Sequence, residues 1–266
     1  MLKKLTQQAT DLMLHSIASG EVMGANLLIT KGNEELVYAQ AGMADREAEK
    51  PIERNTIFRL YSMTKPITAV AAMILMERGM LDLYEPVADI LPAFAHQKVE
   101  RDGKLYTPER PILMHDLWAM TSGLVYPEEQ TMGGRAVTKV FEEACARLES
   151  DHPVSTQEMA EKLRHVHWYL HLGQAGSMSA NQQQAMQQWI GLEGYTYANF
   201  MRRCVAPELQ QGICVKGEYG WDGWLGVYFA NLPEQDITIL MGAQKKDAGT
   251  FSLTRRLRNL CLSNIL

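Results

Sequence analysis

The stretch "RLYSMTKPITAV", residues 59–70, places Ser62 three residues before Lys65, with Pro66 directly behind them at the head of an apolar run. A helix that begins near Ser62 carries Lys65 about one turn along, on the same face as the serine. Pro66 is compatible with this position because the first turn of a helix has few N–H groups with intrahelical partners. Gly79 follows the apolar run, where a C-cap glycine would end the helix. The face predicted to be apolar consists of Ile67, Val70, Ala71, Ile74 and Leu75.

This placement makes chemical sense as a nucleophile with its activator. A serine hydroxyl attacks poorly until a neighbouring group takes its proton, and a lysine partly desolvated at a helix N-terminus can serve as that base. The N–H of Ser62 can also help to hold an oxyanion. The same four residues have a plainer interpretation, an N-capping serine followed by a surface lysine, because S-x-x-K occurs by chance in many chains.

Composition narrows the class of protein. The chain has 266 residues, 46% of them hydrophobic, and a formal net charge of −5 with a pI near 5.8, which argues against a nucleic-acid partner. We expect no membrane span, because no apolar run approaches about 18 residues, and no signal peptide, because polar residues interrupt the first 20 positions. The four cysteines are spread widely without a CxxC pair, which favours free thiols in a reducing, cytoplasmic compartment: Cys145, Cys204, Cys214 and Cys261.

The order of elements predicts an α/β (α+β) fold. Amphipathic helices are expected at both ends of the chain, and hydrophobic residues mark one side of each: Leu2, Leu5, Ala9, Leu12, Met13 and Ile17 in the first, and Leu253, Leu257, Leu260 and Cys261 in the last. The other predicted elements are a β-hairpin over 24–45 turning at Lys31-Gly32-Asn33, a short strand over 56–60, helices within 111–124 and 155–166, antiparallel strands within 217–233 and 236–244, and a last helix over 251–265.

We therefore expect an antiparallel sheet flanked by the terminal helices, with a helical subdomain inserted into it. The whole chain, 1–266, reads as one domain. Its sheet-and-helix part covers about 1–80 and 191–266, and its helical subdomain covers about 81–190.

Three stretches carry a resemblance to a known superfamily: "IFRLYSMTKPITAVAAMILMERGMLDLYEPVADILPAF" from residue 57, "ILMHDLWAMTSGL" from residue 112, and "GEYGWDGWLGVYFANLPEQDITILMGAQ" from residue 217. They resemble the serine β-lactamases and penicillin-binding proteins, and within these the class C β-lactamase-like branch that includes the family VIII carboxylesterases. The resemblance implies a β-lactamase/transpeptidase-like fold. It also implies that Ser62 is the acylated nucleophile and Lys65 its activating partner.

The resemblance further places Trp221-Asp222-Gly223 at the family's third motif, on the strand beside the serine, and makes the N–H of Trp224 the second oxyanion donor. Relatives carry Lys-Thr-Gly or His-x-Gly there. Trp221 cannot pair with a substrate carboxylate and Asp222 would repel one, so the motif favours a neutral ester over β-lactams and peptidoglycan stems. Without the rest of the chain, "GWDGW" would be a strand with aromatic packing and two glycines at a bulge.

The family's second motif, a Tyr-x-Asn whose tyrosine completes the proton relay, has no clear match. By comparison with relatives, about a hundred residues of the helical subdomain are missing before the C-terminal strands. The only Tyr-x-Asn in the chain begins at Tyr197, which is the tentative relay residue and is otherwise a packed strand tyrosine. Tyr169 and Tyr126 are weaker stand-ins.

A histidine cluster gives a rival signal: His165, His167 and His171, of which the last two have the i,i+4 spacing of helix-borne metal ligands. No H-E-x-x-H accompanies them, so we expect partly exposed helix histidines, no metal and no cofactor.

The favoured function is a serine hydrolase, most simply a carboxylesterase on small-molecule esters with weak or no β-lactamase activity. The alternative is a degenerate member of the same fold that acts as a binding protein, a slow acylation trap or an inactive remnant. A shortened subdomain would also expose apolar surface, so we expect self-association.

Overall fold

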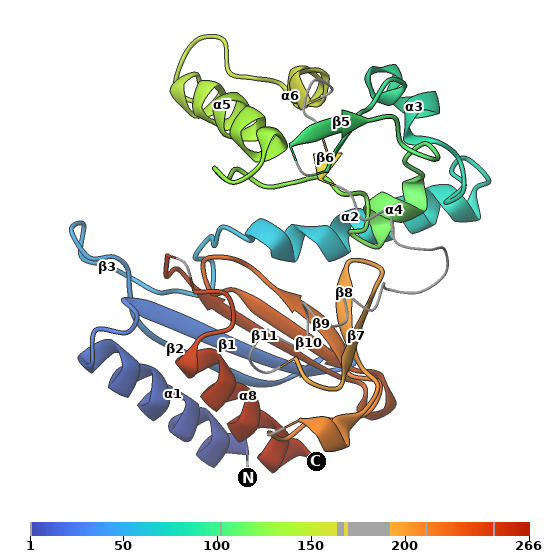
Figure 1. Ribbon diagram of the computed structural model, residues 1–266. Coiled ribbons are helices and arrows are strands. Elements are labelled where there is room, and N and C mark those ends of the chain that lie inside the picture. Colours follow the sequence, from blue (N-terminus) through green and yellow to red (C-terminus); the bar gives the residue numbers. More distant parts are fainter. Residues whose placement is uncertain (1, 102, 164–167, 170–191, 211, 247) are drawn as a thin grey trace. The chain divides into compact units, whose positions relative to one another are not determined.

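The computed structural model describes residues 2–101, 103–163, 168–169, 192–210, 212–246 and 248–266. The chain forms two compact units, one from residues 1–71 and 180–266 and the other from residues 72–179 (Figure 1).

The first unit contains an eight-stranded sheet in the order β3-β2-β1-β11-β10-β9-β8-β7, and every neighbouring pair of strands is antiparallel. The strands are β1 (Gly24–Lys31), β2 (Glu34–Asp45), β3 (Lys50–Pro51), β7 (Tyr195–Ala198), β8 (Met201–Cys204), β9 (Tyr219–Asp222), β10 (Tyr228–Leu232) and β11 (Ile237–Ala243). The predicted hairpin, with its turn at Gly32, and the predicted C-terminal antiparallel strands are confirmed.

Two terminal helices, α1 (Leu2–Ala18) and α8 (Ser252–Ile265), contact each other and share one hydrophobic core with the central strands (Figure 1). Residues of the predicted stripes are buried at Leu5, Ala9 and Met13 in α1 and at Leu253, Leu257 and Cys261 in α8, where Leu262 is buried in addition and Leu260 only partly. Leu2 of the predicted stripe is exposed. The helix-flanked antiparallel sheet confirms the predicted fold class.

The segment before Ser62 differs from its prediction. Residues 56–60 form no strand. They lead as extended chain into a 3₁₀ turn, η1 (Tyr61–Met63), which is followed by α2 (Thr64–Glu77). Gly79 has a φ of 66° and its N–H donates to the Met76 carbonyl, so the predicted C-cap is confirmed.

The apolar residues predicted to share one face of α2 are exposed to solvent. Ile67 and Val70 are 59% and 55% exposed, and the buried residues of the helix are Pro66 and Ala69. The sequence of α2 is apolar almost all the way round, so its periodicity does not single out one face.

The second unit is mainly helical around a small core of Val87, Ile112 and Val137. Its helices are α3 (Val87–Ile90), η2 (Pro92–Phe94), α4 (Met114–Trp118), α5 (Met132–Ala146) and α6 (Thr156–Leu163), and its three-stranded sheet consists of β4 (Val99–Arg101), β5 (Lys104–Tyr106) and β6 (Trp168–Tyr169). The first unit also contains two short 3₁₀ turns, η3 (Pro207–Leu209) and η4 (Pro233–Gln235). The helices predicted within 111–124 and 155–166 are present as the shorter α4 and α6.

Two buried carboxylates of the second unit, Asp116 and Glu100, accept hydrogen bonds. Asp116 accepts two hydrogen bonds from the Arg110 guanidinium and one from the Leu113 N–H. Burial opposes the charged form of Asp116, but these donors outweigh it and hold the pKa of the carboxyl below its ordinary value. Glu100 is buried where its carboxylate accepts the first N–H groups of α5, from Met132 and Gly133.

All four cysteines are free, as expected for thiols. Cys204 and Cys214 are nevertheless not isolated, because their sulfur atoms lie 2.8 Å apart. In the part of the chain that the structure describes, no helix combines the length and apolar character that crossing a membrane requires.

Candidate active site

Ser62 and Lys65 lie together as the sequence predicts. The Lys65 Nζ donates a hydrogen bond of 2.7 Å to the Ser62 Oγ, and both side chains are half-buried. Ser62 lies in the 3₁₀ turn η1 and Lys65 in the first turn of α2, so the serine precedes the α-helix by two residues. Tyr61, just before the serine, has a φ of 47°, which is a strained conformation for a residue with a side chain.

Contacts with the sheet hold the backbone that leads to Ser62. The Gln244 side chain, at the end of β11, accepts from the Arg59 N–H at 3.2 Å and donates to the Arg59 carbonyl at 3.4 Å. The Phe58 ring lies against Gly242, where an added Cβ would come within 2.7 Å of it. These contacts were not apparent from the sequence, because they join residues about 185 positions apart.

The third-motif residues lie beside this segment. An added Cβ on Gly223 would come within 2.2 Å of the Leu60 carbonyl, so the strand end and the serine loop touch backbone to backbone. Trp221 is buried on β9, and its ring meets the Tyr197 ring edge to face at 5.1 Å. Trp224 is half-exposed, and its ring meets Tyr61 edge to face at 5.8 Å.

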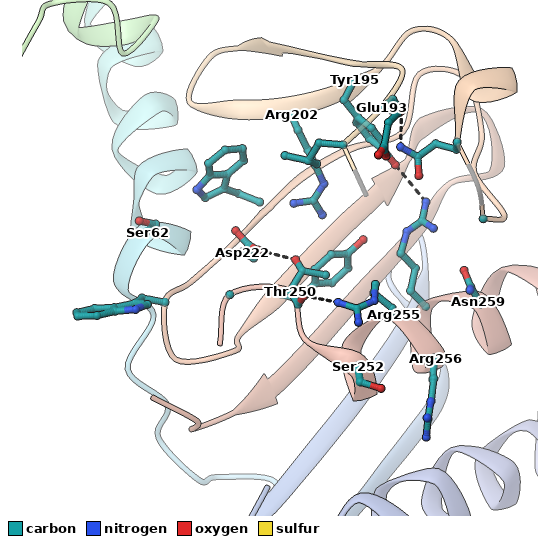
Figure 2. Close-up of a pocket in the computed structure, with 18 residues that line it drawn as sticks. Ser62, Glu193, Tyr195, Arg202, Asp222, Thr250, Ser252, Arg255, Arg256 and Asn259 are labelled. Atoms are coloured by element: carbon teal, nitrogen blue, oxygen red, sulfur yellow. Dashed lines mark hydrogen bonds between the residues drawn. The ribbon is translucent and has the colours of Figure 1, made fainter. Parts of the chain in front are cut away.

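One pocket of about 760 Å³ brings these residues together (Figure 2). Its lining includes Ser62 and three of the four predicted third-motif residues, Trp221, Asp222 and Trp224. Asp222 accepts a hydrogen bond from the Thr250 hydroxyl, so its carboxylate is already engaged on the wall of the pocket.

The pocket is also lined by four arginines that could not be assigned to it from the sequence. Arg202 comes from β8, and Arg255, Arg256 and Arg258 come from α8. The sequence analysis considered only Trp221 and Asp222 as groups that a substrate carboxylate would meet, and these arginines add positive charge to the same pocket. Nothing in local spacing links β8 or the C-terminal helix to the serine. Only the order of strands in the sheet brings them into one pocket.

Arg258 belongs to a buried network at the far wall. It forms an ion pair of 2.5 Å with Glu218, donates from its Nε to the same carboxylate at 3.2 Å, and donates to the Tyr195 hydroxyl at 3.2 Å. The Tyr195 hydroxyl in turn donates to Glu218. Burial raises the pKa of Tyr195, and likewise that of Tyr228, above the ordinary value for a tyrosine. Both pocket tyrosines therefore stay protonated near neutral pH.

Tyr197, the tentative relay residue, lies outside the lining of the pocket that contains Ser62. Tyr197 is a buried residue of β7 that packs on Trp221, and it is not part of the pocket lining. Tyr126 is an exposed loop residue and Tyr169 lies in β6, both in the second unit. The relay assignment stays a prediction.

The metal hypothesis falls on residues that the structure leaves out, because His165, His167 and His171 all lie outside the described residues. Within the described ranges, no three His, Cys, Asp or Glu side chains gather as a metal site would require. The pocket lining combines arginines and neutral donors with the carboxylates of Glu193 and Asp222.

A serine hydrogen-bonded to a lysine at the start of a helix, beside the end of an antiparallel strand, is the arrangement of the S-x-x-K motif in the β-lactamase/transpeptidase fold. Residues 4–167, more than half of the chain, match the Beta-lactamase family, and the chain belongs to that family. Its relatives and structural neighbours include esterases and penicillin-binding proteins.

Two curated relatives illustrate the likeness. "Esterase EstB" of Burkholderia gladioli is 39% identical over 105 residues, covering 40% of this chain and 25% of EstB. "Beta-lactamase" of Pseudomonas fluorescens is 26% identical over 121 residues, covering 44% of this chain and 31% of that protein. The matched part thus spans about a quarter to a third of the length of these relatives.

Solved structures share the fold across nearly the whole chain. "EstCE1, a hydrolase with promiscuous acyltransferase activity" has a TM-score of 0.73 at 15% identity and covers 99% of both chains. A "family VIII carboxylesterase" has a TM-score of 0.58 at 14% identity and covers 98% of both chains. At such identities the likeness concerns the fold alone.

Proposed function

We propose that the protein is a serine hydrolase that cleaves small carboxylic esters through an acyl-enzyme on Ser62. The observation that carries the proposal is the 2.7 Å hydrogen bond between the Lys65 Nζ and the Ser62 Oγ within an open pocket. Membership of the Beta-lactamase family and the similarity to EstB support hydrolysis as the reaction class.

In the proposed mechanism, a neutral Lys65 amine takes the Ser62 hydroxyl proton as the Oγ attacks the ester carbonyl carbon. The N–H groups of Ser62 and Trp224 hold the oxyanion that forms, since early helix N–H groups have no intrahelical partner and Trp224 adjoins the Gly223–Leu60 contact. Collapse of the tetrahedral intermediate breaks the C–O bond, and the alcohol leaves with the proton from Lys65. Lys65 then takes a proton from water as the water oxygen attacks the acyl carbon, the acyl–Oγ bond breaks, the carboxylic acid leaves, and the Ser62 Oγ receives the proton from Lys65.

Release of the acyl group is the demanding step. Tyr195 and Tyr228 are held neutral by burial, so neither can accept a proton from the attacking water. Lys65 must then serve both half-reactions. For this reason we propose slow turnover of activated esters, and weaker turnover still of β-lactams, whose acyl adducts depend on an efficient base for hydrolysis.

The dependence of acyl release on Lys65 alone also favours one alternative function, an acylation trap. If Lys65 cannot activate water, the protein acylates once and stops, which makes it an acylation trap rather than an enzyme. Pre-steady-state hydrolysis of p-nitrophenyl acetate separates the two. A burst of one equivalent without further release would identify the trap, and continued release would identify the hydrolase.

The hydrolase proposal is tested by comparing variants of two serines that line the same pocket, Ser62 and Ser252. Ser62→Ala should abolish hydrolysis of p-nitrophenyl acetate, whereas Ser252→Ala, which removes a pocket serine on α8, should leave it within about threefold. Lys65→Met should lower kcat by about 10²–10⁴, the usual contribution of general acid–base catalysis. Equal rates in wild-type protein and Ser62→Ala would overturn the proposal.

A further inference from the structure

Arg202 is a buried cation without a matching anion. It is only 5% exposed, yet no carboxylate of the described residues lies within ion-pair distance of its guanidinium. Its contacts are a 3.5 Å hydrogen bond from Nη2 to the Phe229 carbonyl and a stacking contact that places Cζ 4.7 Å from the centre of the Tyr228 ring. A guanidinium has five N–H donors, and burying its charge without acceptors costs free energy.

Arg258, in the same pocket, has acceptors for its guanidinium hydrogen bonds. Glu218 receives two of its hydrogen bonds, and the Ile213 carbonyl and Tyr195 hydroxyl receive others. Its charge is therefore balanced within the protein. Arg202 lines the same pocket as Arg258 without comparable acceptors, and Figure 2 shows its guanidinium pointing into the pocket.

The surroundings of Arg202 supply further donors but few acceptors. The Tyr228 hydroxyl is buried next to the Arg202 guanidinium, which also stacks on the Tyr228 ring. Arg255 and Arg256 line the same pocket as exposed side chains. The Asp222 carboxylate accepts from Thr250 and lies beyond ion-pair distance of Arg202. Two carboxylates, those of Glu193 and Asp222, line the pocket, and Asp222 and Glu218 lie near enough to favour the charged form of Arg202, but none of the described carboxylates forms an ion pair with its guanidinium.

Resting on the hydrolase function proposed above, we infer that Arg202 forms a subsite for a carboxylate carried by the ester substrate, with Tyr228 beside it. The substrate class is then a half-ester of a dicarboxylic acid, whose ester group faces Ser62 and whose free carboxylate pairs with Arg202. A carboxylate fits because the planar guanidinium binds it through two parallel hydrogen bonds. A singly charged group also matches one unpaired buried arginine better than a dianion such as phosphate.

The first experiment compares two substrates of equal length, the p-nitrophenyl half-ester of suberic acid and its methyl-capped neutral diester. Wild-type protein should prefer the half-ester in kcat/KM. Arg202→Met should remove about 10- to 100-fold of that preference while changing the neutral diester by less than threefold. Arg46→Met, which removes an exposed arginine in the turn between β2 and β3, is the control and should keep the preference. No preference in wild-type protein, or a preference unchanged in Arg202→Met, would overturn the proposal.

The second experiment separates the subsite from catalysis. Ser62→Ala protein is titrated calorimetrically with suberate monomethyl ester, with dimethyl suberate and with inorganic phosphate. Binding of the monoester that is lost in the Ser62→Ala/Arg202→Met double variant supports the subsite even if wild-type protein hydrolyses nothing. Equal binding of the monoester and the diester overturns the subsite even if hydrolysis is fast, and tighter binding of phosphate overturns the carboxylate assignment.

Folding of the variants is checked by thermal melting. If Arg202→Met does not fold, Arg202→Lys keeps the charge but loses the fork geometry. It should retain part of the half-ester preference, with a higher KM and an unchanged kcat. A full preference in Arg202→Lys together with a salt-independent KM in wild-type protein would contradict a charged subsite.

Discussion

The contact between Gly223 and Leu60 offers a sharp test of how the site is built. Gly223→Ala adds a Cβ that would lie 2.2 Å from the Leu60 carbonyl oxygen and 2.5 Å from the Val227 Cγ2. The first collision is with backbone, so a side-chain rotation cannot relieve it. Relief requires the end of β9 and the loop before Ser62 to separate by about 1 Å, a shift that restores an ordinary contact distance.

The expected loss of activity in Gly223→Ala follows from that shift. A misplacement of about 1 Å between a nucleophile and its oxyanion donor costs roughly 10²-fold, and loss of one oxyanion donor costs about 10²–10³ in kcat. We therefore expect kcat/KM of Gly223→Ala for p-nitrophenyl acetate to fall by about 10²–10³. Overpacking of this kind destabilises by about 1–3 kcal/mol, which lowers the melting temperature by only several degrees.

The matched control is Gly42→Ala on β2. Its Cβ would lie 2.3 Å from the Met23 carbonyl, and Gly42 has a φ of 81°, so the cost in stability should be at least as large. Because Gly42 is not part of the pocket or of the serine loop, the folded variant should keep its activity. A folded Gly223→Ala protein with wild-type activity would refute the claim that the β9 end positions the reacting groups around Ser62.

The remaining predictions concern the tyrosine, the thiols and the state of association. Tyr197→Phe should keep activity within about threefold in a p-nitrophenyl acetate assay, because the ring contact with Trp221 survives; a loss of 10²–10⁴ would instead assign the relay to Tyr197. Burial raises the pKa of Cys204 and of Cys261 to about 12, so at pH 8 an aromatic disulfide reagent should modify exposed Cys145 first and these two only after unfolding. Fast modification of Cys261 in native protein would contradict the packing of α8. Light scattering should show a dimer or larger species, because the apolar face of α2 is exposed; a monodisperse monomer would count against this.

Much of the fold was predictable from local patterns. The hairpin at Gly32, the buried stripe of α8 and the C-cap at Gly79 follow from periodicity and turn chemistry, which act over a few residues. The pair Ser62 and Lys65 was predictable for the same reason, since three residues of spacing in helical chain bring the two side chains together.

What escaped prediction depends on contacts between distant residues. The strand predicted over 56–60 is instead a connecting segment, held by Gln244 and by the Phe58 contact with Gly242 rather than by a ladder of its own. Arg202 and Arg258 enter the pocket only because β8 and α8 border it, an arrangement that no local spacing encodes. The pairing of Cys204 with Cys214 likewise arises from the return of the chain after β8.

The central claim is that Ser62 is an activated nucleophile, and site mapping with a fluorophosphonate tests it most directly. This reagent phosphonylates only serines whose proton is removed by a neighbouring base. The account predicts one adduct per chain, on the peptide that contains Ser62, lost in Ser62→Ala and strongly slowed in Lys65→Met, with Ser252 in the same pocket unmodified. No adduct on folded wild-type protein, or an adduct that persists at another serine in Ser62→Ala, would contradict it.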